Sequence, residues 1–387
     1  MKLYISDYIF TGRELLKDAA FVIKDSVVLD IGNYKLVQKS YPEAEIHKYS
    51  TGLLFPGFIN THTHLELGYL KGKLPKKRGF TNWLKAIMSL KREVDKETII
   101  NSIYKGIEQL KKSGVSVVGD ISNTLFSPKI LKDEMPESVV FFENYSLKKE
   151  KACEVVSELE KKNLKFDIKL YPTPHSIYSS HQCLMKYLCK RSKKLSLHFL
   201  ESEGELEFFK KGGELYKFLG EIGLIEESDI EFKNHWDFLN RCGCLVNGSI
   251  FIHCTYAQKK DLEIIKKING TVCLCLRSNY YITGNLPNIK EILKSGVNIS
   301  IGTDSLASNN DLNFLEELRF IKEKFPDIDA TKIFKWAIYG GAKALGIKWG
   351  FYKNAKAEPY FIPTSSSNPL EEILEGKGTS PLKVFNV

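Results

Sequence analysis

Long apolar runs are absent from this chain. No stretch approaches the roughly 18 consecutive apolar residues that a transmembrane helix needs. Near the amino terminus, Asp7, Arg13, Glu14 and Lys17 interrupt every segment that could serve as the apolar core of a secretory signal. The sequence therefore predicts a protein that does not enter a membrane and that works in the cytoplasm.

Cysteine pairs with the C-x-x-C spacing of structural zinc sites are also missing. The chain has eight cysteines, and its two closest pairs, Cys242 with Cys244 and Cys273 with Cys275, are spaced C-x-C. Cys273 and Cys275 lie in an apolar run, where cysteine behaves as a small hydrophobic residue. We expect both to pack in the core, and the cysteines as a whole fit a cytoplasmic protein.

A clustered basic face is missing as well, although the net charge is +9. Lysines are spread along the chain and mixed with glutamate, as in Lys148-Lys149-Glu150-Lys151. Such mixing favours a solvated surface with many ion pairs, and no basic stretch alternates with aromatics as in a nucleic-acid surface. We expect a small-molecule substrate rather than nucleic acid or a membrane as partner, and the sequence leaves a homodimer open.

The pattern that is present is a repeated alternation of short apolar runs and amphipathic segments, which begins near Phe55. Such alternation is typical of βα units around a parallel sheet. Ile99, Ile103, Ile107 and Leu110, for example, recur at the three- and four-residue spacing of one helix face. Eight apolar runs are predicted to be strands: 58–63, 115–120, 139–144, 168–173, 195–200, 250–253, 271–276 and 297–302.

Eight βα units predict an α/β fold, a (β/α)8 TIM barrel. Short strands are also expected before the barrel, with a hairpin signal at Lys24-Asp25-Ser26, and after it, at 360–362 and 382–385. We predict that residues 1–54 and 349–387 form one small composite β domain beside a barrel of residues 55–348. The long connection 221–244 is expected to cap the barrel mouth.

Polar side chains gather where the predicted strands end. In a barrel of this type the functional groups project from the carboxyl ends of the strands. Five of the eight histidines lie at such ends, and an aspartate follows the last strand. These residues are His62, His64, His175, His198, His253 and Asp304.

Their spacing favours a metal site. Residues two apart on a strand share a face, so His62 and His64 can reach one ion, although an isolated pair could equally be two hydrogen-bonded core histidines. His198 can add a third nitrogen, and a buried Asp304 needs a positive partner, which a metal would supply. Glu201 would stand beside the metal as a general acid or base; its alternative is a surface carboxylate at a helix N-terminus.

Taken together, these motifs resemble the amidohydrolase superfamily. The resemblance rests on PGFINTHTHLE at 56–66, on His198-Phe-Leu-Glu201, on His253-Cys254, and on the segments 277–279 (RSN) and 302–312 (GTDSLASNNDL). Within the superfamily the chain is similar to the branch of adenosine, S-adenosylhomocysteine, guanine and aminodeoxyfutalosine deaminases. The resemblance covers nearly the whole chain.

The resemblance implies a metal-dependent hydrolase that acts on C–N bonds of cyclic amidines, a deaminase. Four residues would bind one divalent metal ion, zinc first and iron second: His62, His64, His198 and Asp304. No lysine stands at the end of the fourth predicted strand, where two-metal relatives have a bridging one. Glu201, His253 and Asp304 would be catalytic, moving protons while metal-activated water replaces the exocyclic amine of an aminopurine-type heterocycle. His175 would contact the substrate.

Further substrate contacts are expected from loops at the barrel mouth. The candidates are Trp83, Arg92, Arg277 and Asn279, although Trp83 could equally pack in the core and Arg92 could be a plain surface cation. Nucleoside deaminases of this branch tend to have a glutamate near the position of Arg92. A cation there, or Arg277, would pair with a substrate carboxylate, which favours an aminodeoxyfutalosine-type nucleoside.

Two other functions stay open at this point. A free-base or pterin deaminase, or a triazine-type chlorohydrolase, would use the same fold and metal. A non-enzymatic metal-binding protein would be expected to lack the acid–base groups, but Glu201 and His253 are both present.

Overall fold

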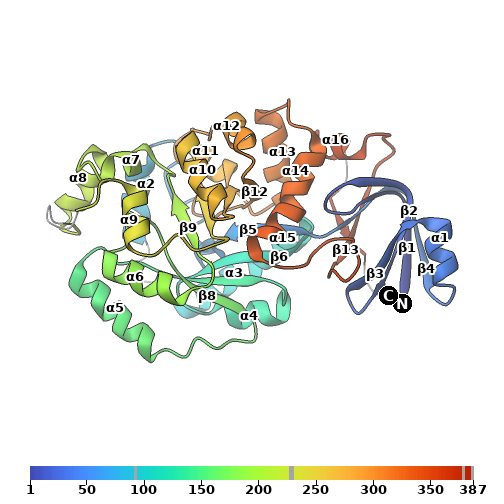
Figure 1. The fold of residues 1–387 in the computed structure, drawn as a ribbon, viewed down its shortest axis with the longest axis horizontal. Coiled ribbons are helices and arrows are strands. Elements are labelled where there is room, and N and C mark those ends of the chain that lie inside the picture. The colour runs from blue at the N-terminus through green and yellow to red at the C-terminus, as the bar shows by residue number, and fades with distance from the viewer. Residues whose placement is uncertain (91–93, 226–230, 377–379, 385–387) are drawn as a thin grey trace.

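The structure is a computed structural model that describes all residues except 91–93, 226–230, 377–379 and 385–387. Its elements form two units arranged along the long axis of the molecule (Figure 1). A small sheet that holds the amino terminus lies at one end, and a larger α/β unit makes up the rest.

The small unit is a six-stranded sheet to which both ends of the chain contribute. Its order is β14-β13-β4-β1-β2-β3, and β13 pairs antiparallel with β4 after the chain has left the larger unit. The expected hairpin is confirmed between β2 and β3, where Asp25 and Ser26 adopt φ of 50° and 61°, as a two-residue hairpin turn requires. The elements are β1 (Lys2–Phe10), β2 (Leu15–Lys24), β3 (Val27–Asn33), α1 (Tyr34–Ser40), β4 (Glu45–Pro56), β13 (Pro359–Pro363) and β14 (Leu382–Lys383). Between β13 and β14, α16 (Pro369–Leu374) packs against helices of the larger unit.

The larger unit contains two parallel four-stranded sheets, in the orders β5-β6-β7-β8 and β12-β11-β10-β9. All eight predicted strands are present, with ends within two residues of the prediction. Single parallel bridges join the sheets at both edges, from Ser176 to His198 and from Thr63 to Asp304. The strands are β5 (Phe58–Thr63), β6 (Val115–Ser122), β7 (Val139–Asn144), β8 (Lys169–Pro174), β9 (Ser196–Phe199), β10 (Ile250–His253), β11 (Thr271–Leu274) and β12 (Asn298–Ile301).

Helices connect these strands and lie outside them (Figure 1). The predicted apolar stripe belongs to α3, whose Ile103, Ile107 and Leu110 are buried. The helices are η1 (Leu65–Leu70), α2 (Phe80–Leu90), α3 (Lys96–Lys112), α4 (Ser127–Glu134), α5 (Lys149–Lys161), α6 (Gln182–Arg191), α7 (Glu203–Phe208), α8 (Gly213–Glu221), α9 (His235–Arg241), α10 (Lys259–Lys267), α11 (Leu276–Ile282), α12 (Ile289–Ser295), α13 (Phe314–Lys324), α14 (Ala330–Lys335), η3 (Trp336–Gly340) and α15 (Gly341–Leu345).

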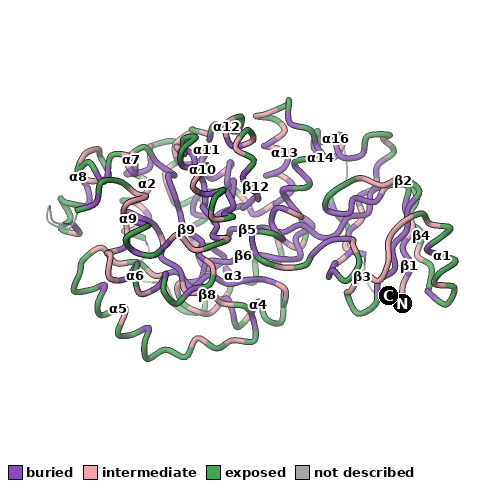
Figure 2. Tube along the Cα trace, in the orientation of Figure 1, coloured by how far each residue is buried: buried purple, intermediate pink, exposed green. Residues whose placement is uncertain are grey.

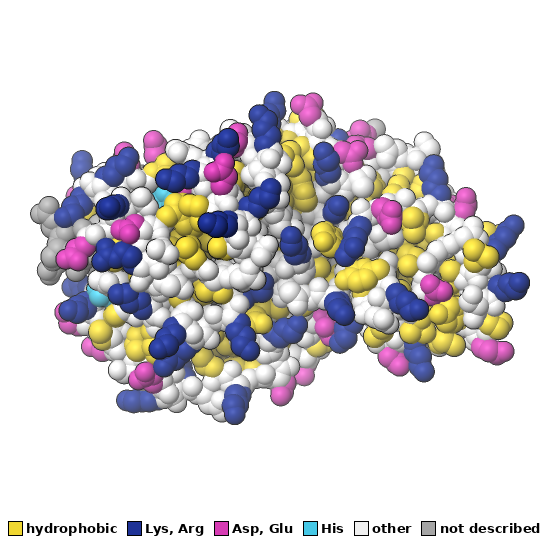
Figure 3. Space-filling model, viewed as in Figure 1, with side chains coloured by type: hydrophobic (Ala, Val, Ile, Leu, Met, Phe, Trp, Pro, Cys, Tyr) yellow, Lys and Arg dark blue, Asp and Glu magenta, His cyan; other side chains and the backbone are white. Residues whose placement is uncertain are grey.

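Burial follows this layering. Every residue of β5 and β6 is buried, and Figure 2 shows buried strands at the centre with exposure along the outer helices. On the face drawn in Figure 3, lysine and arginine side chains are scattered over both units among acidic and hydrophobic ones. None of the helices in the described part of the chain is long and apolar enough to cross a membrane.

The cysteines follow the prediction in part. Cys273 and Cys275 are fully buried. Cys189 and Cys244, however, form a disulfide, with sulfurs 2.08 Å apart, which the C-x-C spacing did not indicate because the partner lies 55 residues away in sequence. Disulfides are unusual in the cytoplasm, so the cytoplasmic location stays a prediction.

Gly119 shows how closely the central strands approach one another. A Cβ at this position of β6 would lie 2.2 Å from the carbonyl oxygen of Thr61 and 3.0 Å from Leu345. Only glycine allows this contact, and the backbone it touches is the one that leads into His62.

We predict that Gly119→Ala destabilises the fold by at least about 2 kcal/mol, because the clash involves backbone that cannot rotate away. Gly220→Ala is the matched control, since a Cβ there meets nothing within 4 Å and alanine is the better helix residue. Urea unfolding measures both. Equal unfolding free energies for the two variants would contradict the packing argument.

Candidate active site

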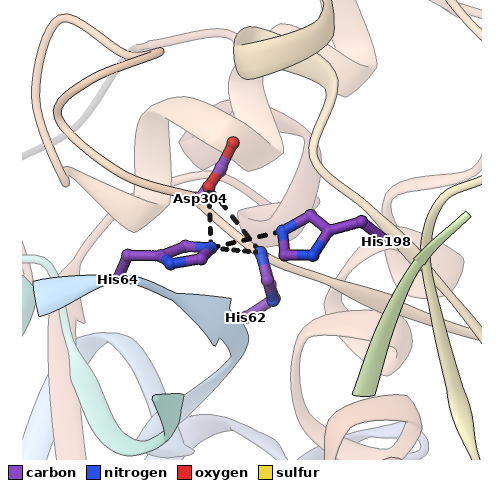
Figure 4. A group of neighbouring side chains, drawn as sticks. All are labelled: His62, His64, His198 and Asp304. Atoms are coloured by element: carbon purple, nitrogen blue, oxygen red, sulfur yellow. Dashed lines mark hydrogen bonds and ion pairs between the residues drawn. The ribbon is translucent and has the colours of Figure 1, made fainter. Parts of the chain in front are cut away.

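Four side chains from three strand ends converge on one point (Figure 4). The Nε2 atoms of His62 and His64 lie 3.2 Å apart, and those of His64 and His198 lie 3.3 Å apart. Asp304 Oδ1 lies 3.6 Å from His62 Nε2 and 3.5 Å from His64 Nε2. All four residues are buried, and their ligand atoms lie within 4.8 Å of one another.

These separations fit a metal ion. Ligands at about 2.0–2.1 Å from a tetrahedral zinc lie about 3.3 Å from one another, which matches the distances above. Without an ion, several nitrogen lone pairs and a carboxylate oxygen would face each other in a water-poor space, at a high cost in free energy. Three imidazoles and one carboxylate are also the donor types that zinc and iron accept.

The backbone turns sharply where the strands end. Leu200, His253 and Asp304 adopt positive φ values of 49°, 70° and 57°. Each non-glycine residue in this region costs on the order of 1–3 kcal/mol, and such strain is found where a side chain must take an unusual direction. Here it directs side chains into the space above the strands.

Asp304 is held by hydroxyl groups on its far side. Its Oδ2 accepts hydrogen bonds from Ser278 Oγ at 2.6 Å and Ser308 Oγ at 2.7 Å, which leaves Oδ1 toward the histidines. Burial opposes ionisation, but hydrogen bonding to His62 and the charges of the neighbouring histidines hold the pKa of Asp304 well below its usual range. The group is therefore a carboxylate.

His198 is oriented by its other nitrogen. Nδ1 lies 3.2 Å from the carbonyl oxygen of His175 and 3.5 Å from Glu143 Oε1, so it is the donor and Nε2 keeps its lone pair for the cluster. The His175 ring stacks on His198, with centroids 4.5 Å apart. Burial, followed by the charges of neighbouring histidines, lowers the pKa of His198, which keeps its imidazole neutral.

Glu201 and His253, the two acid–base candidates, lie next to each other in the site. Glu201 Oε1 lies 3.5 Å from His253 Nε2. Burial, with the charges of Asp304 and Glu205, raises the pKa of Glu201 well above its usual value, while burial lowers the pKa of His253 to about 4. Asn279 Oδ1 accepts from His253 Nδ1 at 2.7 Å, so Nε2 is the basic nitrogen near Glu201.

Glu205 fixes the loop that carries Glu201. Its carboxylate accepts backbone N–H groups from Leu200 at 2.8 Å, Glu201 at 2.8 Å and Ser202 at 3.2 Å, as part of a capping box on α7. Burial raises the pKa of Glu205 to about 7, although these backbone hydrogen bonds act in the opposite direction.

A cavity of about 450 Å³ opens above the cluster. Its buried end contains the catalytic candidates, and an apolar wall is formed mainly by α2 and the region after α7. That wall includes Trp83, Leu84, Ile87, Met88, Leu219 and Leu224. Leu224 belongs to the connection that was predicted to cap the mouth.

The structure brings some predicted substrate contacts to this cavity and not others. His175 and Trp83 line it, and Trp83 Nε1 donates to the carbonyl oxygen of Ala307 at 3.2 Å. Arg277 does not line it, because its guanidinium binds Asp311 at 2.8 and 3.0 Å. Asn279 is likewise withdrawn behind His253. Arg92 lies outside the described residues.

Several residues that contact the site were not predicted from the sequence. Glu143, at the end of β7, contacts His198 and lines the cavity, and the rule of strand carboxyl ends could have found it. Ser278 lies in the segment 277–279 and Ser308 in the segment 302–312. Both segments were recognised as motifs, but serine by its residue type alone does not indicate contact with Asp304.

The pattern of the amidohydrolase family matches residues 53–351, which include every residue of this cluster. The chain belongs to the amidohydrolase family. The resemblance seen in the sequence is therefore confirmed. An adenosine deaminase of Helicobacter pylori is 30% identical over 354 residues, covering 87% of this chain and 85% of that protein.

The chain is also similar to two aminofutalosine-type deaminases. An aminodeoxyfutalosine deaminase of Nitratiruptor sp. is 27% identical, covering 87% of this chain and 84% of its own length. The crystal structure of Helicobacter pylori aminofutalosine deaminase with methylthio-coformycin has a TM-score of 0.84 at 25% identity, covering 98% of this chain and 97% of that one.

We predict that Glu205→Gln changes the pH dependence of stability. Because the folded pKa of about 7 exceeds the unfolded value, the Glu205 contribution is full below about pH 4.5 and declines as the pH rises through 7. The advantage of the wild type over Glu205→Gln should fall by about 3 kcal/mol across this window. Urea unfolding at several pH values measures it, with the exposed Glu203→Gln as control. A difference that does not vary with pH would contradict the raised pKa.

Proposed function

We propose that this family member is a metal-dependent hydrolytic deaminase of an aminopurine nucleoside, of the aminodeoxyfutalosine type. The observation that supports it most directly is the pair Glu201 and His253, which lies in the cavity beside the four-residue ligand cluster. The names of the relatives, adenosine deaminase and aminodeoxyfutalosine deaminase, agree with the deaminase predicted from the sequence.

His62, His64, His198 and Asp304 would hold one divalent ion, zinc before iron. When bound, such an ion lowers the pKa of a coordinated water to about 7 and so supplies a nucleophile at neutral pH. The neutral state of His198 leaves its Nε2 available as a donor, and Ser278 and Ser308 keep Asp304 Oδ1 turned toward the same point.

The protein groups divide the proton transfers. Glu201, whose raised pKa lets it hold a proton near neutral pH, would protonate the ring nitrogen next to the carbon that carries the amine. His253 Nε2 and Asp304 would accept one proton from the attacking water and pass it to the departing ammonia, and the second water proton would return to Glu201. Asn279 contributes as a positioning residue, since it fixes which nitrogen of His253 is basic.

The cavity fits an aromatic heterocycle with a substituent. Most of the surface that lines its 450 Å³ is apolar, which suits a ligand with a flat apolar body and few polar atoms. His175 and Trp83 are the proposed contacts to that body.

We also propose that the two parallel sheets close into the predicted (β/α)8 barrel, with residues 1–54 and 349–387 as the composite β domain. The single bridges at both edges of the sheets support this arrangement.

We predict that Glu201→Gln lowers kcat by about 10²–10⁴ and leaves metal content unchanged, because the amide keeps the shape but cannot donate the proton. Steady-state rates of ammonia release and elemental analysis of the same sample measure both. Glu203→Gln, an exposed neighbour, is the control. Near-full turnover by Glu201→Gln with metal bound would exclude the assigned role.

The proposed function is tested by ammonia release from a panel of aminopurine nucleosides, free bases, pterins and chlorotriazines. We expect deamination of the nucleosides, with about one metal ion per chain and loss of activity on chelation. Preferred turnover of a free base, a pterin or a chlorotriazine would replace the proposal by that alternative.

A further inference from the structure

The segment Lys148–Lys151 lies at the mouth of the cavity. Its sequence predicts ordinary solvated surface, but Lys148 and Lys151 both line the cavity. Lys148 is the N-cap residue of α5, and Lys151 lies in the first turn of that helix. Residues three apart near a helix start can face one neighbouring space, so the two ammonium groups are able to act on one ligand group.

Charge is unequally distributed along the cavity. The carboxylates among its described lining residues, Glu143, Glu201 and Asp304, are all buried with the ligand cluster. The basic residues of that described lining are Lys148 and Lys151, and both are exposed. The inner end therefore combines the candidate metal ligands with the acid–base candidates, whereas the described cavity lining at the outer end has two lysines and no carboxylate.

The charges of Lys148 and Lys151 are available to bind an anionic ligand group. The Lys148 side chain makes no ion pair within the described ranges of the chain. Lys151 pairs with Glu154 at 2.7 Å, but both side chains are about 60% exposed, at 63% and 60%, and exposed pairs of this kind are weak. Arg277, the cation that the sequence analysis favoured for this purpose, is committed to Asp311.

We propose that Lys148 and Lys151 form an anion-binding subsite that selects substrates with a carboxylate at the end remote from the reacting amine. The proposal rests on the deaminase function above and names its specificity-determining residues. The apolar wall next to the subsite, with Leu147 from the same loop, favours an aryl or other apolar spacer before the carboxylate. A nucleoside whose 5′ substituent is a carboxyphenyl group has this chemistry.

The test compares two substrates that differ only in charge. One is a 6-aminopurine nucleoside with a 5′-linked carboxyphenyl group, and the other is its methyl ester. For the wild type, we expect kcat/KM to be at least tenfold higher for the acid than for the ester. In Lys148→Met/Lys151→Met this ratio should fall about tenfold, chiefly through KM for the acid, and added salt should weaken the wild-type preference.

Lys149→Met is the matched control, because Lys149 lies between the two lysines in sequence and does not line the cavity. It should keep the wild-type ratio. If kcat/KM in the double variant falls equally for acid and ester, or falls for neither, the acid-to-ester ratio stays unchanged and the proposed subsite is overturned. Faster turnover of adenosine 5′-monophosphate than of the aryl acid would contradict the proposed preference for an apolar spacer.

Failure of the proposed function gives a different result. If the wild type releases ammonia from neither acid nor ester, the deaminase proposal fails. The subsite is then tested by calorimetric binding of the same carboxyphenyl nucleoside to wild type, double variant and Lys149→Met. Binding that is weakened about tenfold only in the double variant supports the lysines, and equal affinity in all three overturns them.

Discussion

A carboxylate buried among imidazoles is the constraint on which this molecule depends. Asp304 stands 3.5–3.6 Å from His62 and His64, where an ionised group without a positive partner would be very costly. Its surroundings are arranged to keep it charged, through the hydroxyl groups of Ser278 and Ser308 on one side and the cluster on the other. The neighbouring Gly302 is needed too, because a Cβ there would lie 2.9 Å from His62. A cation that binds the cluster would offset the cost of all these contacts at once.

The same burial separates the protonation states of the two acid–base groups. Low access to water makes the protonated carboxyl of Glu201 and the neutral imidazole of His253 the favoured forms, because burial penalises whichever form is charged. One environment thus produces a proton donor and a proton acceptor 3.5 Å apart. Glu205 holds the backbone N–H of Glu201, so the position of this proposed proton donor depends on one short loop.

The sequence predicted the strands and the ligand cluster because both obey local rules. Apolar runs bounded by helical periodicity give strands, and polar residues at strand ends of such a fold face the same side. The ion pair that holds Arg277 away from the cavity could not be predicted this way, since its partner Asp311 lies 34 residues further on. The Cys189–Cys244 disulfide likewise depends on tertiary packing that no spacing pattern records.

The segment Lys148–Lys151 also could not be recognised from the sequence, although here the structure adds residues to the cavity, whereas it removed Arg277. Its alternation of charges is what a solvated helix start has, and by sequence alone it is indistinguishable from the rest of the basic surface. Only the position of α5 beside the cavity distinguishes this segment from the rest of the basic surface. In a fold that serves many functions, the proposed function gives the inner residues the task of breaking the C–N bond. The substrate must then be selected by the outer loops, where composition is least informative and geometry decides.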